Sequence, residues 1–328
     1  MKTFHKLNIV ISVLLLAILA VSCNPKTESM GSAGQTIVKL FPDGYNMIPF
    51  DAAATPQTGV LFEVRRDANS STALNSETTV TLEYDVDTTI LKKYNEINGT
   101  SLIPLPASLG TTTPAPTAGV ITLTFAAGEF SKSVAVNIPN ASIFDFTQQY
   151  AFAYKMTSVS GTGIKSAATN DTIVAQVLIK NKYDGVYVVT ANSPMVDILN
   201  SGLTGWYPFT YNLETSGENS VKCLLVDPGY YDYYHPITSG GSYSVYGAFG
   251  LEITFDPATG NIVSVTNVWG NPPSNTRMPV IDPSGVNKYD AATKIIQFKY
   301  WMIQPSLVPT PPNIRTSFDE TWTYKGPR

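Results

Sequence analysis

Hydrophobic and polar residues alternate with a period of two along much of the chain. From Thr79 to Val86, the apolar Val80, Leu82 and Tyr84 are separated by polar residues. Because successive side chains of a strand point to opposite faces of a sheet, this pattern predicts a half-buried strand. Similar runs predict further strands in the first half of the chain at residues 121–125, 133–138, 152–156 and 173–179.

One segment departs from this alternation. Between Asp87 and Asn98 apolar residues recur at helical spacing, and Asn98-Gly99 provides a stop signal, so a helix is predicted there. The proline- and threonine-rich stretch 104–119 is typical of a loop. The turn at residues 127–129 separates two predicted strands, and we expect these strands to form a hairpin.

A polar turn at Asn181–Gly185 precedes a second series of alternating segments. These predict strands at residues 186–190, 207–213, 221–226, 245–255, 262–269, 295–303 and 316–324. Turn signals such as Asp256–Gly260 separate them, because Asp and Pro favour turns and Gly supplies positive φ. The sequence therefore predicts an all-β fold of two tandem β-domains: a sandwich at residues 36–181 and an antiparallel sandwich or partly closed barrel at residues 182–328.

The first 22 residues have the layout of a secretory signal peptide. Two lysines precede an apolar run from Ile9 to Val21, which is shorter than the ~20 apolar residues that span a bilayer. Ala20–Cys23 resembles a lipobox, with the leucine typical of its first position standing one residue earlier, at Leu19. We therefore expect residues 1–22 to be removed as a lipoprotein signal peptide and Cys23 to be lipidated.

Acyl chains on Cys23 would hold the mature protein firmly to a membrane, because each buried methylene contributes about 0.8 kcal/mol. Residues 23–35 are mostly small and polar, which is typical of a flexible tether. We expect a cell-envelope protein anchored to the outer membrane. The tether does not distinguish the surface-exposed face from the periplasmic face.

Charge and cysteine content narrow the range of partners. Removing the two lysines of the signal peptide changes the formal net charge from −4 to −6, and basic residues are not clustered. Nucleic acid and anionic lipid headgroups are therefore not expected partners. With Cys23 used for lipid, Cys223 is the remaining thiol, and its strand-like surroundings predict a buried, inert side chain.

Several motifs along the chain suggest a family. They are Val80–Asp87, Leu91–Asn95, Asn98–Thr100, Leu105-Pro106, Phe125–Gly128 and Tyr183–Tyr187. Together they resemble the N-terminal domain of unknown function that is common in lipoproteins of the Bacteroidetes. Tyr150–Tyr154 departs from the family's Tyr-x-Leu-Pro pattern, and the loop at residues 111–118 is atypical.

This resemblance implies an immunoglobulin-like sandwich for the first domain. It also implies a genomic context, because many members of this family are encoded beside outer-membrane glycan-uptake pairs of the starch-utilisation type. The segments 287–290, 298–300 and 318–322 resemble the C-terminal β-domain that often follows. The resemblance covers most of residues 40–328 and carries over no catalytic residues.

An aromatic run provides the leading candidate for ligand contact. Tyr230-Tyr231-Asp232-Tyr233-Tyr234-His235 follows a turn at Asp227–Gly229. Aromatic faces can stack on sugar rings, and Asp and His can bond sugar hydroxyls, so the run predicts a glycan site. The same run would also be expected if these tyrosines packed into the core at one end of the domain, because aromatic side chains bury large areas.

Four tryptophans divide into two groups by their surroundings. Trp206 and Trp269 stand beside turns and are added to the candidate ligand-binding residues, although either could instead close the core. Trp301 and Trp322 lie in strand patterns and are expected in the core.

The sequence shows no catalytic constellation, and we expect a protein that is not an enzyme. Asp319 and Glu320 are adjacent and would face opposite sides of a strand, whereas glycosidases need two carboxylates roughly 5–9 Å apart across a cleft. The oxygen donors of residues 256–261 are better explained by a hairpin turn than by a calcium site. We expect no catalytic residues, no metal and no cofactor.

Two functions are left open by the sequence. The first is a non-catalytic lipoprotein that captures polysaccharide, with the first domain as a spacer and an aromatic glycan site in the second. The second is an adhesin-like or scaffold surface protein that binds other proteins. A solvent-facing platform of the candidate aromatics would favour glycan, and their burial would favour a protein partner.

Overall fold

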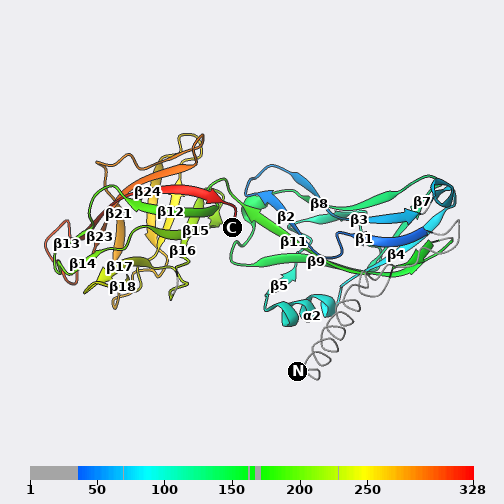
Figure 1. Ribbon diagram of the computed structural model, residues 1–328, viewed down its shortest axis with the longest axis horizontal. Helices are drawn as coiled ribbons and strands as arrows, with labels where there is room; N and C mark the ends of the chain where they lie inside the picture. The colour runs from blue at the N-terminus through cyan, green and yellow to red at the C-terminus, as the bar shows by residue number, and fades with distance from the viewer. Residues whose placement is uncertain (1–35, 69, 162, 167–170, 228) are drawn as a thin grey trace, which may run out of the picture.

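The computed structural model describes residues 36–68, 70–161, 163–166, 171–227 and 229–328. Two β-rich domains lie side by side along the long axis of the molecule (Figure 1). The expected signal peptide, lipidated Cys23 and tether lie outside the described residues. The part of the chain that is described contains one α-helix, and this helix is too short to cross a membrane. The predicted all-β fold of two β-domains is confirmed.

The N-terminal domain is a sandwich of two sheets. One sheet has the order β10-β1-β3-β8-β6, and the other has the order β2-β11-β9-β4-β7 with β5 paired to β9. The strands of the first sheet are β1 (Thr36–Phe41), β3 (Gln57–Ala68), β6 (Thr111–Thr113), β8 (Ser131–Ile138) and β10 (Gly163–Lys165). Those of the second are β2 (Gly44–Asp51), β4 (Thr78–Tyr84), β5 (Leu102–Pro104), β7 (Val120–Phe125), β9 (Gln149–Val159) and β11 (Thr172–Lys180).

Alternate residues of both sheets form one buried core between them. Phe62 on β3 packs against Tyr154 on β9, with ring centroids 5.3 Å apart, and both side chains are fully buried. Two short 3-10 helices, η1 (Ser71–Asn75) and η2 (Ala141–Ile143), lie in connections of this domain. The alternation seen in the sequence therefore comes from strands that are buried on one face.

Helix α2 (Thr89–Asn98) covers the outer face of the second sheet. The carboxylate of Asp85 accepts hydrogen bonds from the amides of Ile90 and Leu91, at 3.0 and 2.9 Å, which satisfies donors at the start of the helix. Gly99 ends the helix in the left-handed region, at a φ of 64°, where glycine carries no steric penalty. The helix predicted from the sequence is confirmed.

The expected hairpin of residues 121–125 and 133–138 is not formed. Strand β7 pairs with β4 in one sheet, whereas β8 pairs with β3 in the other. The turn at residues 127–129 therefore carries the chain from one layer of the sandwich to the other. Local turn chemistry marks the change of direction but does not determine which strand becomes the partner.

The C-terminal domain contains a curved antiparallel sheet with the strand order β20-β19-β16-β15-β12-β24-β23-β21. Its two end strands, β20 and β21, lie next to each other without pairing, so the sheet is a nearly closed barrel. Its strands are β12 (Gly185–Ala191), β13 (Val196–Asp197), β15 (Phe209–Gly217), β16 (Ser220–Leu225), β19 (Leu251–Phe255), β20 (Ile262–Asn267), β21 (Met278–Ile281), β22 (Lys288–Asp290), β23 (Ile295–Ile303) and β24 (Ile314–Gly326).

A three-stranded sheet, β14-β17-β18, adds to this domain. It consists of β14 (Leu203–Gly205), β17 (His235–Ser239) and β18 (Ser242–Tyr246). The sequence predicted one strand at residues 245–255, and the structure corrects this to β18 and β19 in different sheets. Ala248 adopts a positive φ of 51° between them, which breaks the strand.

The barrel interior is dominated by aromatic residues. Trp322 is fully buried, as expected, and Cys223 is a buried free thiol. Trp301 was expected in the core but alternates to the outer face of β23 and is half-buried. The period of two places Met302, rather than Trp301, in the interior.

The connection between the domains is fixed to the C-terminal domain. The side chain of Asn181 donates to the carbonyls of Gly217 and Ser220, at 3.0 and 2.8 Å. Tyr183 is fully buried and stacks on Phe255, with ring centroids 4.0 Å apart. The two hydrophobic cores thus separate between Ile179 and Tyr183.

Candidate functional site

Five aromatic side chains form a continuous row on the C-terminal domain, which we call the aromatic row. Its members, in order, are Trp206, Tyr243, Tyr230, Tyr234 and Trp269. Centroids of successive rings are 4.8, 5.3, 6.4 and 5.4 Å apart. The two terminal tryptophans are 38% and 40% exposed, and the three tyrosines are half-buried. The structure thus brings four of the predicted site residues together on a solvent-accessible surface.

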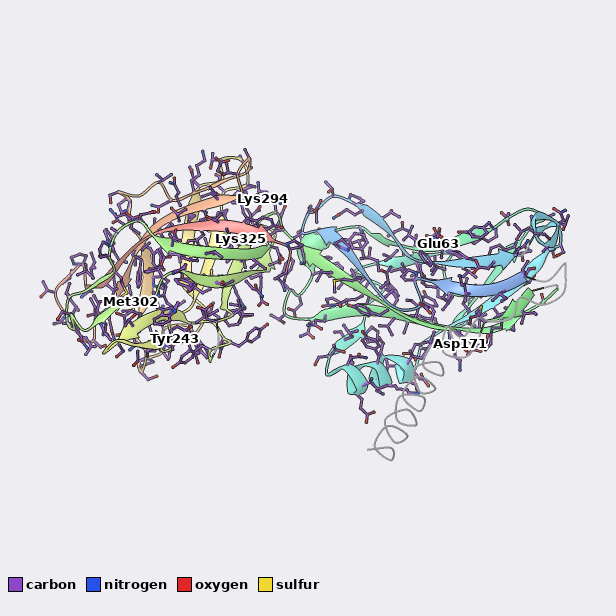
Figure 2. All side chains as sticks on the ribbon, in the orientation of Figure 1. Glu63, Asp171, Tyr243, Lys294, Met302 and Lys325 are labelled. Atoms are coloured by element: carbon purple, nitrogen blue, oxygen red, sulfur yellow. The ribbon has the colours of Figure 1, made fainter. Side chains whose placement is uncertain are left out.

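Separate segments of the chain assemble the aromatic row. Trp206 follows β14, Tyr243 lies on β18 (labelled in Figure 2), and Trp269 follows β20. Tyr230 and Tyr234 lie in the loop between β16 and β17. These segments are far apart in sequence, so the row exists only in the folded domain.

A network of hydrogen bonds fixes the Trp269 end of the row. The indole Nε1 of Trp269 donates to the main-chain carbonyl of Tyr233, at 2.6 Å. The side chain of Asn267 accepts from the amides of Trp269 and Gly250, at 3.2 and 3.1 Å. A Cβ added at Gly250 would lie 2.3 Å from the Tyr233 carbonyl oxygen, so only glycine permits this approach.

The planes of the rings turn along the row. Successive interplanar angles are 47°, 74° and 90° from Trp206 to Tyr234, and only Tyr234 and Trp269 are close to parallel, at 8°. Edge-to-face contacts between neighbouring aromatic rings in this arrangement are energetically favourable. They present a twisted surface rather than a flat one.

Two carboxylates lie beside the row. Asp227 accepts a long hydrogen bond of 3.5 Å from the hydroxyl of Tyr243, and burial raises the pKa of Asp227 above its ordinary value. Asp232 accepts a hydrogen bond of 2.8 Å from the amide of Tyr233. Both can accept hydrogen bonds from ligand hydroxyls, and both would repel an anionic ligand.

Two of the predicted tyrosines lie outside the row. Tyr231 is 74% exposed, the largest exposure among the aromatic residues of this loop. Tyr233 instead lines a cavity between the two domains, where its hydroxyl donates a hydrogen bond of 2.6 Å to Glu214. Ligand contact by Tyr231, Asp232 and Tyr233 stays a prediction.

His235 is corrected from a ligand-binding residue to a core residue. It is the first residue of β17, its side chain points into the barrel, and it is 0% exposed. Its Nε2 lies 3.0 Å from Oε1 of the fully buried Glu320. A side chain with no accessible surface cannot contact a ligand in the folded protein, so the inward register of β17 excludes the predicted role.

The carboxylate of Glu320 is the centre of a buried polar network. It also accepts hydrogen bonds from Tyr207 at 2.5 Å, Tyr300 at 3.2 Å and the indole of Trp322 at 2.9 Å. Burial is the main cause that raises the pKa of both tyrosine hydroxyls, which keeps them neutral donors. This network compensates for the burial of a carboxylate and specifies the packing of the barrel.

Tyr243 is the member of the row that sequence reasoning missed. It lies on a short strand, β18, whose pairing with β17 across Gly240 and Gly241 could not be recognised from alternation alone. The pattern Ser-Tyr-Ser-Val-Tyr at residues 242–246 does indicate a strand, and places Tyr243 and Tyr246 on opposite faces. That signal would have placed Tyr243 on the outer face of a strand but would not have identified its neighbours in the row.

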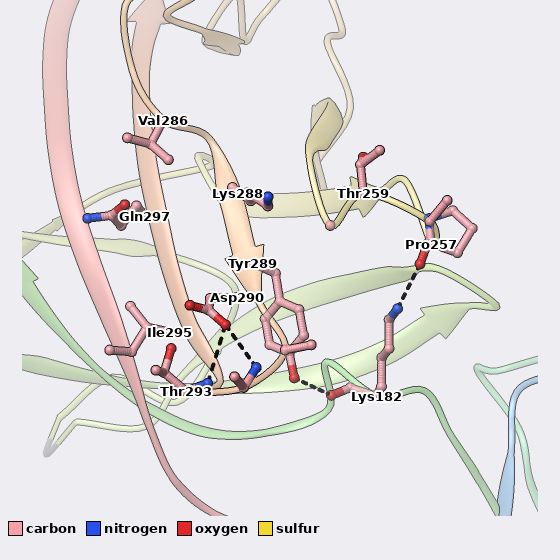
Figure 3. Close-up of a pocket in the computed structure, with 14 residues that line it drawn as sticks. Lys182, Pro257, Thr259, Val286, Lys288, Tyr289, Asp290, Thr293, Ile295 and Gln297 are labelled. Carbon is pink, nitrogen blue, oxygen red and sulfur yellow. Dashed lines mark hydrogen bonds between the residues drawn. The ribbon is translucent and has the colours of Figure 1, made fainter.

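A separate cavity of about 630 Å³ lies beside the domain connection (Figure 3). Asp290 in its wall accepts from the amides of Ala292 and Thr293, at 2.8 and 3.4 Å, and nearby Asp256 makes the same kind of turn. Lys182 donates to the carbonyl of Pro257, at 3.0 Å. Asp290 and Asp256 therefore stabilise turns, and a turn is what the sequence predicted for residues 256–261. Among the described residues, no group of three or more His, Cys, Asp or Glu side chains could hold a metal ion.

The fold and the site define a two-domain all-β protein with an exposed aromatic surface on its second domain. A family model described as a "-like, N-terminal domain" matches residues 46–163, which lie within the first sandwich. No curated protein matches.

Solved structures extend the comparison to both domains. A protein of unknown function from Bacteroides ovatus is 12% identical with a TM-score of 0.52, covering 89% of this chain and 95% of its own. A second one from the same organism is 12% identical with a TM-score of 0.47, covering 88% and 93%. An auxiliary nutrient binding protein from Bacteroides thetaiotaomicron is 12% identical with a TM-score of 0.47, covering 85% and 90%.

The first of these structures has the same two-domain fold. Together with the family match within the first sandwich, it confirms the expected organisation of the fold, an N-terminal sandwich domain followed by a second β-domain.

Proposed function

We propose that this protein is a non-catalytic lipoprotein of the cell envelope that binds glycans through the aromatic row. The observation that carries the proposal is the continuity of five aromatic rings, three tyrosines between two exposed tryptophans, with carboxylates beside them. Sugar rings present apolar faces that pack on aromatic rings and hydroxyls that bond to Asp227 and Asp232. The first domain would act as a spacer between the lipid anchor and this surface.

The geometry of the row favours one class of glycan. Because the ring planes turn by up to 90° between neighbours, the row cannot lie flat against a crystalline polysaccharide surface. A single soluble chain can follow a twisted surface, and each step between centroids is comparable to the length of a sugar ring. The two carboxylates favour neutral glycans over uronic or sulfated ones.

Display on a membrane would strengthen a weak individual site. Many copies on one surface can hold the same polysaccharide, and avidity then exceeds the affinity of one site by orders of magnitude. Such capture would raise the local concentration of substrate for neighbouring glycan-uptake proteins of the outer membrane.

Affinity electrophoresis in native gels with soluble neutral polysaccharides tests this proposal. The soluble protein of residues 36–328 should be retarded by at least one of them, and Trp206→Ala combined with Trp269→Ala should abolish the retardation. Phe130→Ala, which removes a 46% exposed aromatic side chain from the first domain, is the matched control and should leave retardation unchanged. Equal retardation of the double variant would exclude the row as the binding surface.

A second candidate function rests on a different surface. Val196, Ile198 and Leu199 are 55%, 59% and 49% exposed in one short segment around β13. An apolar segment of this kind favours a protein partner, as in the adhesin-like or scaffold alternative. Absence of retardation by every polysaccharide, with the fold intact by circular dichroism, would favour this alternative.

A further inference from the structure

The three-stranded sheet β14-β17-β18 carries three members of the aromatic row. Trp206 directly follows β14, Tyr234 directly precedes β17, and Tyr243 lies on β18. The rings of Trp206 and Tyr243 are in contact, with centroids 4.8 Å apart. The position of this sheet on the barrel therefore determines where these three rings stand.

Two residues at one end of this sheet point toward a common partner inside the barrel. Strands β14 and β17 are antiparallel neighbours, and Tyr207 and His235 lie beyond the residues that pair. The rings of Tyr207 and His235 are arranged edge to face, with centroids 6.5 Å apart. Tyr207 is adjacent in sequence to Trp206, and His235 is adjacent to Tyr234. A shift of either residue would therefore move a member of the row.

The carboxylate of Glu320 divides its contacts between the row and the barrel. Its Oε1 accepts a hydrogen bond from the hydroxyl of Tyr207, at 2.5 Å, and lies 3.0 Å from Nε2 of His235. Its Oε2 accepts from the hydroxyl of Tyr300 on β23, at 3.2 Å, and from the indole of Trp322 on β24, at 2.9 Å. One oxygen thus contacts the two residues beside the row, and the other contacts two barrel strands.

The surroundings of this carboxylate restrict both residues beside the row. Glu320 and His235 are fully buried. Because a buried polar group without a partner is costly, Tyr207 and His235 are held where both reach Oε1 of Glu320. A Cβ added at Gly205 would overlap the ring of Tyr207, so this ring lies directly against the main chain that precedes Trp206.

We propose that Glu320 is a positioning residue of the aromatic row, which sets the places of Trp206 and Tyr234 through Tyr207 and His235. The inference rests on the proposed function, because a glycan that spans the row needs its rings at fixed separations. Binding sites depend on supporting groups that hold the contacting side chains in place before the ligand arrives. Loss of a bond to Oε1 should therefore lower glycan affinity although every ring that contacts the glycan is kept.

Two variants of residues 36–328 test the inference as a matched pair, Tyr207→Phe and Tyr300→Phe. Each removes one hydroxyl that bonds Glu320 and keeps the ring, but the first hydroxyl bonds Oε1 and the second bonds Oε2. Retardation at several polysaccharide concentrations gives the dissociation constant for the glycan. The indole N–H resonance of Trp206 in proton–nitrogen correlation spectra, assigned with Trp206→Phe, reports the position of this ring without ligand. Urea unfolding gives the stability of both variants.

Tyr207→Phe should shift the Trp206 resonance and weaken glycan binding roughly tenfold, which corresponds to about 1.4 kcal/mol. Tyr300→Phe should lose comparable stability and leave both the resonance and the binding unchanged. An unmoved resonance in Tyr207→Phe, or equal effects of the two variants, would overturn the inference. A shifted resonance with unchanged binding would also overturn it and leave the proposed function standing. If no polysaccharide retards the wild type, the proposed function fails, and a resonance shift confined to Tyr207→Phe still supports the positioning by Glu320.

Discussion

The indole of Trp269 donates a hydrogen bond of 2.6 Å to the main-chain carbonyl of Tyr233, which joins the end of β20 to the loop that carries Tyr230 and Tyr234. The bond holds the ring of Trp269 parallel to that of Tyr234, with centroids 5.4 Å apart. One tryptophan therefore both presents an exposed aromatic surface and fixes the position of the loop beside it.

Gly250→Ala should displace this loop. The new Cβ would meet the Tyr233 carbonyl oxygen at 2.3 Å, so main chain has to move. We expect a loss of stability of about 1–3 kcal/mol, as for other overpacked sites, and weaker glycan binding. Urea unfolding followed by tryptophan emission measures the loss of stability, and affinity electrophoresis measures glycan binding.

The control for this prediction is a second glycine of the same domain. Gly270→Ala is not suitable because Gly270 has a positive φ of 67°. Gly247, which has open space at its Cβ, is suitable, and Gly247→Ala should have little effect on either quantity.

Asp227→Asn should change the pH dependence of stability. Burial raises the pKa of Asp227 in the folded protein above its unfolded value. Its folded state therefore binds the proton more tightly, and this contribution to stability is complete below the unfolded pKa and is lost as pH rises through the folded pKa. We expect the variant to have a higher Tm than the wild type at pH 7, and the difference to disappear near pH 3. A lower Tm for the variant at pH 7 would show that the charged carboxylate stabilises the loop.

Cys223 should be unreactive in the native protein. Burial is the main cause that raises the pKa of its thiol well above the ordinary value, and its side chain is fully buried. Thiolate is the reactive form, so both effects slow alkylation. In residues 36–328 it is the only cysteine, and Ellman's reagent should detect less than a tenth of a thiol per chain without denaturant and one thiol in urea. Rapid native labelling would contradict the barrel packing around β16.

Glu320→Ala should destabilise the barrel strongly. The change leaves His235, Tyr207, Tyr300 and the indole of Trp322 without their common acceptor. A buried donor left without its acceptor typically costs about 1–3 kcal/mol, and this change affects several donors at once. Glu320→Gln keeps one acceptor oxygen and should cost less. Chemical denaturation of the two variants measures the difference, and equal small losses would show that the network contributes little to folding.

The positions of most strands could be predicted because burial of one face leaves a period of two in the local sequence. Pairing could not: β7 and β8 follow a hairpin-like turn but belong to different sheets. The same limit applied to the site. Residue type indicated Trp206, Tyr230, Tyr234 and Trp269, but only strand register decides that His235 points into the barrel and that Tyr243 completes the row.

The emission of the exposed tryptophans during glycan titration tests the aromatic row most directly. Trp206 and Trp269 are exposed members of the row, Trp301 is half-buried outside the row, and Trp322 is fully buried, so stacking of a sugar on the row should alter mainly the emission of the first two. Titration of residues 36–328 with the polysaccharide that retards the protein most should shift the emission to shorter wavelength, and the shift should be lost when Trp206→Phe and Trp269→Phe are combined. An unchanged emission spectrum at saturating polysaccharide would contradict the proposal that glycans bind on the row.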